Sequence, residues 1–133
     1  MIGLDTNVLV RYIMQDDARQ APLANRLIES LTAQDPGYVA LVSVVELAWV
    51  LVSAYELDRS QLVAAFEGLL RTKELRVEDA EIVWKALRVV QATNADFADC
   101  LIACSAAAAG CTCTMTFDRA AAKAAGMSLV SPA

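Results

Sequence analysis

Four acidic residues stand at the ends of short β-prone segments or at the entry of expected helices, and they are the best candidates for chemistry. Asp5 and Asp118 each follow a short β-prone run, whereas Glu46 and Asp99 each lie in the first turn of an expected helix. In open α/β proteins these positions tend to share the sheet edge at which ligands bind. Four carboxylates gathered there would repel one another and raise one another's pKa values unless a cation is present.

The residue types narrow the chemistry further. The sequence contains no histidine, which excludes Ser-His-Asp and Cys-His catalysis and a histidine-bound catalytic zinc. Oxygen-only ligands select hard ions, Mg²⁺ or Mn²⁺. Two such ions about 4 Å apart can activate water and stabilise the leaving oxygen of a phosphodiester. The pattern therefore predicts a site for metal-dependent phosphoryl transfer.

Several of these acids also have a simpler interpretation at the start of a helix. Asp5 could merely end a strand and cap a helix. Glu46 could complete a capping box that begins at Ser43, and Asp96 or Asp99 could serve the helix dipole. Taken singly, Glu46 and Asp96 fit these structural roles, so the chemical interpretation depends on the whole set. Thr6 is the expected cap of the first helix.

An alternation of strands and helices is expected to position these residues. Strands are expected at 2–4, 38–42, 75–77, 111–117 and 128–130. Helices are expected at 8–14, from 16–17 to about 31, and at 44–55, 58–71, from 79, 96–109 and from 119 to Gly126, with Gly110 as a left-handed cap. This order predicts one domain over 1–133, a three-layer α/β/α fold with a short, mostly parallel sheet flanked by helices.

The composition points to a folded chain that has a partner. Hydrophobic residues make up 57% and charged residues 20% of the sequence, which argues against disorder and predicts apolar surface for an oligomer or partner to cover. No apolar run reaches the roughly 18 to 20 residues of a membrane span. No signal-peptide pattern is present, so a cytoplasmic location is expected. Segment 44–55 is apolar nearly all round, which predicts burial on more than one side.

Four cysteines lie close together in the chain, at Cys100, Cys104, Cys111 and Cys113. Without an export signal they are expected to be thiols. A zinc site is disfavoured because there is no histidine and no Cys-x-x-Cys pair. Small buried hydrophobic residues are the preferred interpretation.

Four segments taken in order resemble the motifs of PIN-domain ribonucleases, and most closely those of the VapC toxins of bacterial and archaeal toxin–antitoxin pairs. They are Leu4-Asp5-Thr6-Asn7, Ser43-Val44-Val45-Glu46-Leu47, Asp96-Phe97-Ala98-Asp99-Cys100-Leu101-Ile102-Ala103 and Thr116-Phe117-Asp118-Arg119. Each motif alone is short and common, whereas the ordered set is specific. The resemblance covers essentially the whole chain.

The resemblance implies a parallel sheet, an acidic pocket at the strand ends, and Mg²⁺- or Mn²⁺-dependent endonucleolytic cleavage of RNA that leaves a 5′-phosphate and a 3′-hydroxyl. By motif position, Asp5, Glu46, Asp99 and Asp118 would be the catalytic, metal-binding acids. Asp96 would be an accessory acid or only a helix cap.

Other polar residues receive supporting roles in this interpretation. Candidates for hydrogen bonds that orient the acids are Thr6, Asn7 and Thr116. Candidates for RNA contacts are Arg11, Arg119 and Lys123, although solvated surface is the preferred interpretation of each. The net charge of −5 is unlike the basic footprint of most nucleic-acid binders. Modest non-specific affinity, with a structured RNA as the target, is therefore expected.

The resemblance also implies protein partners. A VapB-type antitoxin helix could occupy a groove formed by segments 9–13 and 44–52. A homodimer is expected through the helices around 59–90. Trp49 and Trp84 could belong to such an interface or to the core.

Three other functions are compatible with a strand that ends in an aspartate. A haloacid-dehalogenase-type phosphatase needs a second aspartate two residues after the first, and Asn7 stands there instead. A response-regulator receiver needs an acidic pair after the first strand and a lysine near the end of a late strand, and neither is clearly present. A non-catalytic PIN-like binding module remains open, although the presence of all four acids argues against it.

Overall fold

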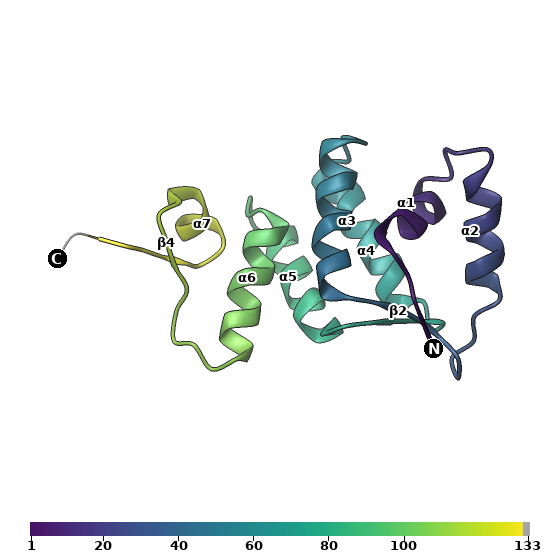
Figure 1. Ribbon diagram of the computed structural model, residues 1–133. Helices are drawn as coiled ribbons and strands as arrows, with labels where there is room; N and C mark the ends of the chain where they lie inside the picture. The colour runs from purple at the N-terminus through teal and green to yellow at the C-terminus, as the bar shows by residue number, and fades with distance from the viewer. Residues whose placement is uncertain (132–133) are drawn as a thin grey trace. The chain divides into compact units, whose positions relative to one another are not determined.

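The computed structural model describes residues 1–131, and Figure 1 shows them as helices joined by very short strands. In chain order the elements are β1 (Ile2–Gly3), α1 (Thr6–Met14), α2 (Gln20–Glu29), β2 (Gly37–Val39), α3 (Leu41–Ser53), α4 (Arg59–Arg71), β3 (Leu75–Val77), α5 (Ala80–Ala92), α6 (Phe97–Ala108), β4 (Met115–Thr116), α7 (Arg119–Ala124) and β5 (Ser128–Leu129). The chain divides into two compact units, Met1–Ala80 and Glu81–Ala133. The predicted alternation of strands and helices is confirmed.

The first unit contains a parallel sheet in the order β1-β2-β3. Gly3 pairs with Tyr38, and Tyr38 pairs with Arg76. Beyond the paired residues, the Leu4 N–H donates to the Tyr38 carbonyl at 2.9 Å. Because all three strands run in the same direction, their carboxyl ends share one edge of the sheet. Asp5 leaves the sheet at that edge.

Gly37 is required where β2 passes beneath two buried leucines. A Cβ atom at this position would lie 2.7 Å from Leu4 Cδ1 and 2.8 Å from Leu31 Cδ1. Both leucine side chains are buried, so neither can move aside freely. The absence of a side chain at Gly37 thus lets Leu4, the residue before Asp5, pack onto the sheet.

The helices of the first unit bury one apolar face each. In Figure 1, α1 lies between α2 and α3, in agreement with the contacts that α1 makes with both. The most deeply buried side chains of this unit are Leu9, Val39, Val44, Leu47, Leu51 and Phe66. Leu9 and Val10 of α1 are therefore core residues, whereas the antitoxin groove predicted along segments 9–13 and 44–52 stays a prediction.

The start of α3 differs from the sequence-based expectation. The helix begins at Leu41, and its N-cap residue, Ala40, offers no side-chain hydrogen bond. Instead, the Leu41 N–H donates to Glu78 Oε1 at 2.7 Å. The predicted capping box of Ser43 and Glu46 is wrong because the helix has already begun two residues before Ser43. For the same reason β2 stops at Val39 and does not extend to residue 42.

Helix α3 has one buried and one exposed apolar face. The buried face comprises Val44, Leu47, Ala48 and Leu51, and α3 contacts α1 and α4. The opposite face, which we call the α3 outer face, comprises Val42, Val45, Trp49 and Val52. Trp49 is 69% exposed, which excludes the core alternative for this tryptophan, and the prediction that α3 is buried on more than one side is wrong. An apolar composition all round does not by itself supply neighbours for every face.

The second unit consists of α5, α6, α7 and a separate two-stranded parallel sheet, in which Met115 pairs with Ser128. Its buried residues include Val83, Ala86, Leu87, Val90, Phe97, Cys100 and Leu101. Gly110 has φ +98°, which confirms the left-handed conformation expected after α6. The strand expected over 111–117 is confined to Met115–Thr116, because the chain before it does not pair.

The cysteines are free thiols, as predicted. Cys100 is buried and Cys104 is partly buried, whereas Cys111 and Cys113 are exposed. The prediction of buried cysteines is therefore wrong for the last two, which lie before the short strand β4. Partial burial raises the pKa of the Cys104 thiol, and the charge of Lys85 opposes this shift.

Within residues 1–131, no helix combines the length and apolar character that crossing a lipid bilayer requires.

Candidate functional site

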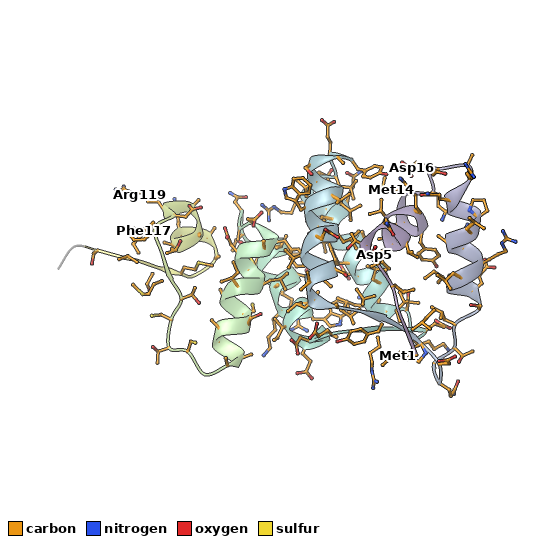
Figure 2. All side chains as sticks on the ribbon, viewed as in Figure 1. Met1, Asp5, Met14, Asp16, Phe117 and Arg119 are labelled. Atoms are coloured by element: carbon orange, nitrogen blue, oxygen red, sulfur yellow. The ribbon has the colours of Figure 1, made fainter. Side chains whose placement is uncertain are left out.

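Asp5 occupies the turn between β1 and α1, where Figure 2 labels it. Its backbone is extended, with φ −76° and ψ 156°, and it is the N-cap residue of α1. Its Oδ1 accepts a hydrogen bond from the Thr6 N–H at 2.8 Å. The other carboxylate oxygen, Oδ2, makes no hydrogen bond with the described residues. Asp5 therefore caps the helix with one oxygen and retains the other for a ligand.

Glu46 lies with Asp5 at one pocket of the first unit. The pocket has a volume of about 510 Å³, and its lining residues are Asp5, Thr6, Asn7, Val10, Arg11, Glu46, Val50, Ala54 and Tyr55. They come from the turn between β1 and α1, from α1, from α3 and from the connection that follows α3. Two acids that lie 41 positions apart in the sequence thus reach the same cavity because α1 packs against α3.

Glu46 does not cap α3 and forms no hydrogen bond with the described residues that would explain its position on this helix. It lies in the second turn of the helix, and Glu78 caps the first residue. The Glu46 side chain is exposed and forms no hydrogen bond with the described residues. The geometry thus removes the capping role that the sequence suggested for Glu46.

Thr6 and Asn7 also line this pocket. Thr6 is not the cap that the sequence suggested, because Asp5 holds that position. The Thr6 side chain is 5% exposed, and its Oγ1 has no hydrogen-bond partner among the described residues. A buried hydroxyl without a partner costs free energy, so the Thr6 hydroxyl retains an unused capacity for hydrogen bonding.

A second acidic group lies in the second unit. Asp96 is the N-cap residue of α6, and its Oδ2 accepts a hydrogen bond from the Asp99 N–H at 3.2 Å. Partial burial raises the pKa of the Asp99 carboxyl, and the negative charges of Asp96 and Asp118 raise it further. Asp96 and Asp118 therefore both lie close enough to Asp99 to influence its ionisation. A bound cation would relieve this repulsion.

Asp118 is held by two sets of hydrogen bonds. Its Oδ1 accepts from the Ala120 N–H at 2.8 Å and from the Ala121 N–H at 3.2 Å, which caps α7. Its own N–H donates to Thr116 Oγ1 at 3.0 Å. Thr116 thus orients the backbone of Asp118. Asp118 and Asp96 both act as helix caps, whatever else they do.

The basic residues of the sequence analysis have different surroundings. Arg119 and Lys123 lie exposed on α7, and Figure 2 labels Arg119 beside Phe117. Arg11 instead lines the pocket with Asp5 and Glu46, and it contacts Tyr55, a residue that the sequence analysis did not single out. No sequence signal could have found this pair, because its members are 44 residues apart and meet only through packing.

The donor set suits a hard divalent ion in each unit, although no three acidic or thiol groups within residues 1–131 lie close enough to hold one ion together. The pocket of the first unit offers the carboxylates of Asp5 and Glu46, the Asn7 amide and the unpartnered Thr6 hydroxyl. The second unit offers the carboxylate of Asp99 and those of Asp96 and Asp118, whose charges act on it. Oxygen donors of this kind prefer Mg²⁺ or Mn²⁺ to softer metals.

Comparison with known proteins supplies the family. The sequence matches the family model of the PIN domain over residues 2–127, which spans both units. No curated protein matches the chain. A PIN domain is a three-layer α/β/α fold, as predicted, and PIN domains are generally nucleases that hydrolyse nucleic acids. The chain belongs to the PIN-domain family.

Proposed function

We propose that this PIN-domain chain is a cytoplasmic Mg²⁺- or Mn²⁺-dependent endoribonuclease of the VapC type, the toxin of a toxin–antitoxin pair. The observation that carries the nuclease assignment is the convergence of Asp5 and Glu46 on one pocket. Neither Asp5 Oδ2 nor the Glu46 carboxylate is engaged by another described residue. The four-motif resemblance and the family match support the same activity.

The proposed catalytic acids are Asp5, Glu46, Asp99 and Asp118, and their carboxylates would bind the divalent metal. When bound, the ion would increase the acidity of water and stabilise the leaving oxygen of the phosphodiester. Asp5 is oriented for this role by the Thr6 N–H. Glu46, which is exposed and has no capping duty, can orient the attacking water and accept its proton. The products expected are a 5′-phosphate and a 3′-hydroxyl.

The residues around these acids would fix their geometry. Thr6 and Asn7 lie beside Asp5 in the pocket, and Thr116 holds the Asp118 backbone. Asp96 holds the Asp99 backbone, so we assign it a positioning role. Arg119 and Lys123, exposed on α7, would contact the RNA backbone. We treat the two units as parts of one catalytic domain because the family match spans both.

The test is cleavage of total RNA by the wild type and by Asp5→Asn, Glu46→Gln, Asp99→Asn and Asp118→Asn, with Mg²⁺ or Mn²⁺ and after chelation. Each variant is expected to lose activity by about a hundredfold or more, as for disrupted metal sites. Asparagine caps helices about as well as aspartate, so lost activity at Asp5 or Asp118 would not reflect a lost cap. Glu29→Gln, an exposed acid on α2, is the matched control. Equal cleavage by wild type and all four variants would refute the assignment.

The toxin role is supported by the resemblance and by the apolar α3 outer face. We propose that an amphipathic helix of a VapB-type antitoxin covers this face, and that the chain forms a homodimer through α4, β3 and α5. Expression of the chain alone is expected to arrest growth, whereas the Asp5→Asn variant is tolerated. Normal growth with soluble, RNA-cleaving protein would exclude the toxin role and leave the nuclease intact. Light scattering on the purified chain is expected to give the mass of a dimer.

A further inference from the structure

Arg11 is the one basic residue among those lining the pocket with Asp5 and Glu46. Its Nε donates to Gln20 Oε1 at 2.8 Å, and its Nη1 donates to Tyr55 OH at 3.2 Å. The guanidinium has five N–H donors. These hydrogen bonds use Nε and Nη1, and Nη2 makes no hydrogen bond with the described residues. The side chain is 31% exposed, so this nitrogen is available to a ligand.

The guanidinium is held in place by groups from different parts of the first unit. Asp16 Oδ1 lies 3.5 Å from Arg11 Nη1, and Asp16 Oδ2 accepts a hydrogen bond from the Tyr55 hydroxyl at 2.8 Å. That hydrogen bond raises the pKa of the Tyr55 hydroxyl, so it remains protonated. Asp16 precedes α2, Gln20 begins it, and Tyr55 follows α3. Arg11 is therefore oriented before any ligand binds, which lowers the entropy cost of binding.

The charge of the pocket makes such a cation useful. An RNA strand that approaches Asp5 and Glu46 meets two carboxylates, which repel its phosphates. Arginine binds phosphate through paired N–H groups. The Asp16 carboxylate offsets the Arg11 charge only partly. The two groups are 3.5 Å apart and both side chains are partly exposed to solvent, which weakens their attraction.

We propose that Arg11, oriented by Tyr55 and Asp16, is the phosphate-binding residue that seats the RNA backbone beside the Asp5–Glu46 pocket. This inference depends on the proposed endoribonuclease function and specifies how that site recognises its substrate. Arg11 contacts a phosphate of the strand. Tyr55 acts through Arg11 and is a positioning residue.

The experiment compares wild type with Arg11→Ala, Arg11→Lys and Tyr55→Phe in two assays. The first measures kcat and KM for cleavage of one labelled RNA with Mn²⁺. The second measures binding of the same RNA by fluorescence anisotropy with Ca²⁺ in place of Mn²⁺, over a range of salt concentrations. Arg26→Ala, which removes an exposed arginine of α2 that does not line this pocket, is the control for the loss of one positive charge.

For Arg11→Ala we expect KM to rise about tenfold or more, because a hydrogen bond to a charged group is lost, and kcat to change little. The slope of log affinity against log salt should fall by about one, as for loss of one phosphate contact. Arg11→Lys should keep the salt slope but not the full affinity. Lysine retains the positive charge but lacks the paired N–H groups of the guanidinium. Tyr55→Phe should raise KM less than Arg11→Ala and keep the salt slope. Arg26→Ala should match wild type in both assays.

A purely structural role for Arg11 would give different results. The variant would then lose thermal stability, kcat would fall without a rise in KM, and the salt slope would match that of wild type. That outcome overturns the inference while the nuclease assignment stands. If the wild type neither cleaves nor binds RNA, the proposed function fails, and the inference fails with it.

Discussion

Glu78, one residue beyond β3, caps the helix that carries Glu46: its Oε1 accepts a hydrogen bond from the Leu41 N–H at 2.7 Å. Glu78 and Leu41 are 37 positions apart in the sequence. Their contact joins the carboxyl end of one strand to the helix that follows its neighbour β2. It also anchors the start of α3, the helix that carries Glu46.

Glu78→Ala should destabilise the fold and weaken RNA cleavage together. Loss of a helix-capping acceptor costs about 0.5 to 2 kcal/mol, measurable as a lower urea midpoint with an unchanged m-value. Cleavage should fall because the cap anchors the start of α3, and Glu46 lies in the next turn of this helix. Glu78→Gln keeps an acceptor oxygen and should retain most of the stability. If the alanine variant is as stable as wild type, the Glu78 cap does not hold α3.

Two glycine substitutions should change stability in opposite directions. Gly37→Ala places a Cβ against Leu4 and Leu31, at 2.7 and 2.8 Å, and such overpacking costs about 1 to 3 kcal/mol. Gly68→Ala, in the interior of α4 with nothing within 4 Å of its Cβ, should stabilise by about 0.5 to 1 kcal/mol. Denaturant unfolding of the two variants tests both signs. A stabilising Gly37→Ala would mean that the leucines can move aside.

Asp17 should make the stability of the start of α2 depend on pH. Hydrogen bonds from the N–H groups of Gln20 and Arg19 lower the pKa of its carboxyl below 3.8, the value for an unperturbed aspartate. Because the folded-state pKa is depressed, the stabilisation is complete above the unfolded value and is lost as the pH falls through the folded value. The stability advantage of wild type over Asp17→Ala should thus be constant from neutral pH to about pH 5 and should shrink below it. An advantage that grows on acidification would contradict this assignment.

Thr116 should affect activity through Asp118. Thr116→Val removes the acceptor of the Asp118 N–H bond at 3.0 Å while keeping the shape of the side chain. We expect a stability loss of about 0.5 to 1.5 kcal/mol and a roughly tenfold or greater loss of cleavage, as for residues that orient metal ligands. Thr116→Ser keeps the hydroxyl and should behave as wild type. Full activity of the valine variant would show that Asp118 needs no such support.

Divalent ions should stabilise the folded chain independently of any RNA. A ligand that binds only the folded state at about a hundredfold excess over its dissociation constant adds about 2.7 kcal/mol. Calorimetry should therefore show a higher unfolding temperature with Mn²⁺ than after chelation. Asp5→Asn should reduce this increase, and Glu29→Gln should not. An unfolding temperature that does not respond to Mn²⁺ or Mg²⁺ would contradict the proposed metal site.

The sequence alone determined the features that depend on neighbouring residues. Asp5 at the end of β1, Asp96 as the cap of α6 and Gly110 in a left-handed turn were all predictable. These features follow from local backbone geometry and hydrogen bonding within one turn. The α/β class followed for the same reason, because periodicity is a local property.

Tertiary structure decided what depends on residues distant in the sequence. Glu78, and not Ser43, caps α3, because β3 places its carboxylate at Leu41. Trp49 is exposed because the neighbours of α3 cover its opposite face. The hydrogen bond between Arg11 and Tyr55 exists only because α1 packs beside α3. The residue types thus specified the chemistry, whereas packing between distant segments determined which side chains reach the pocket.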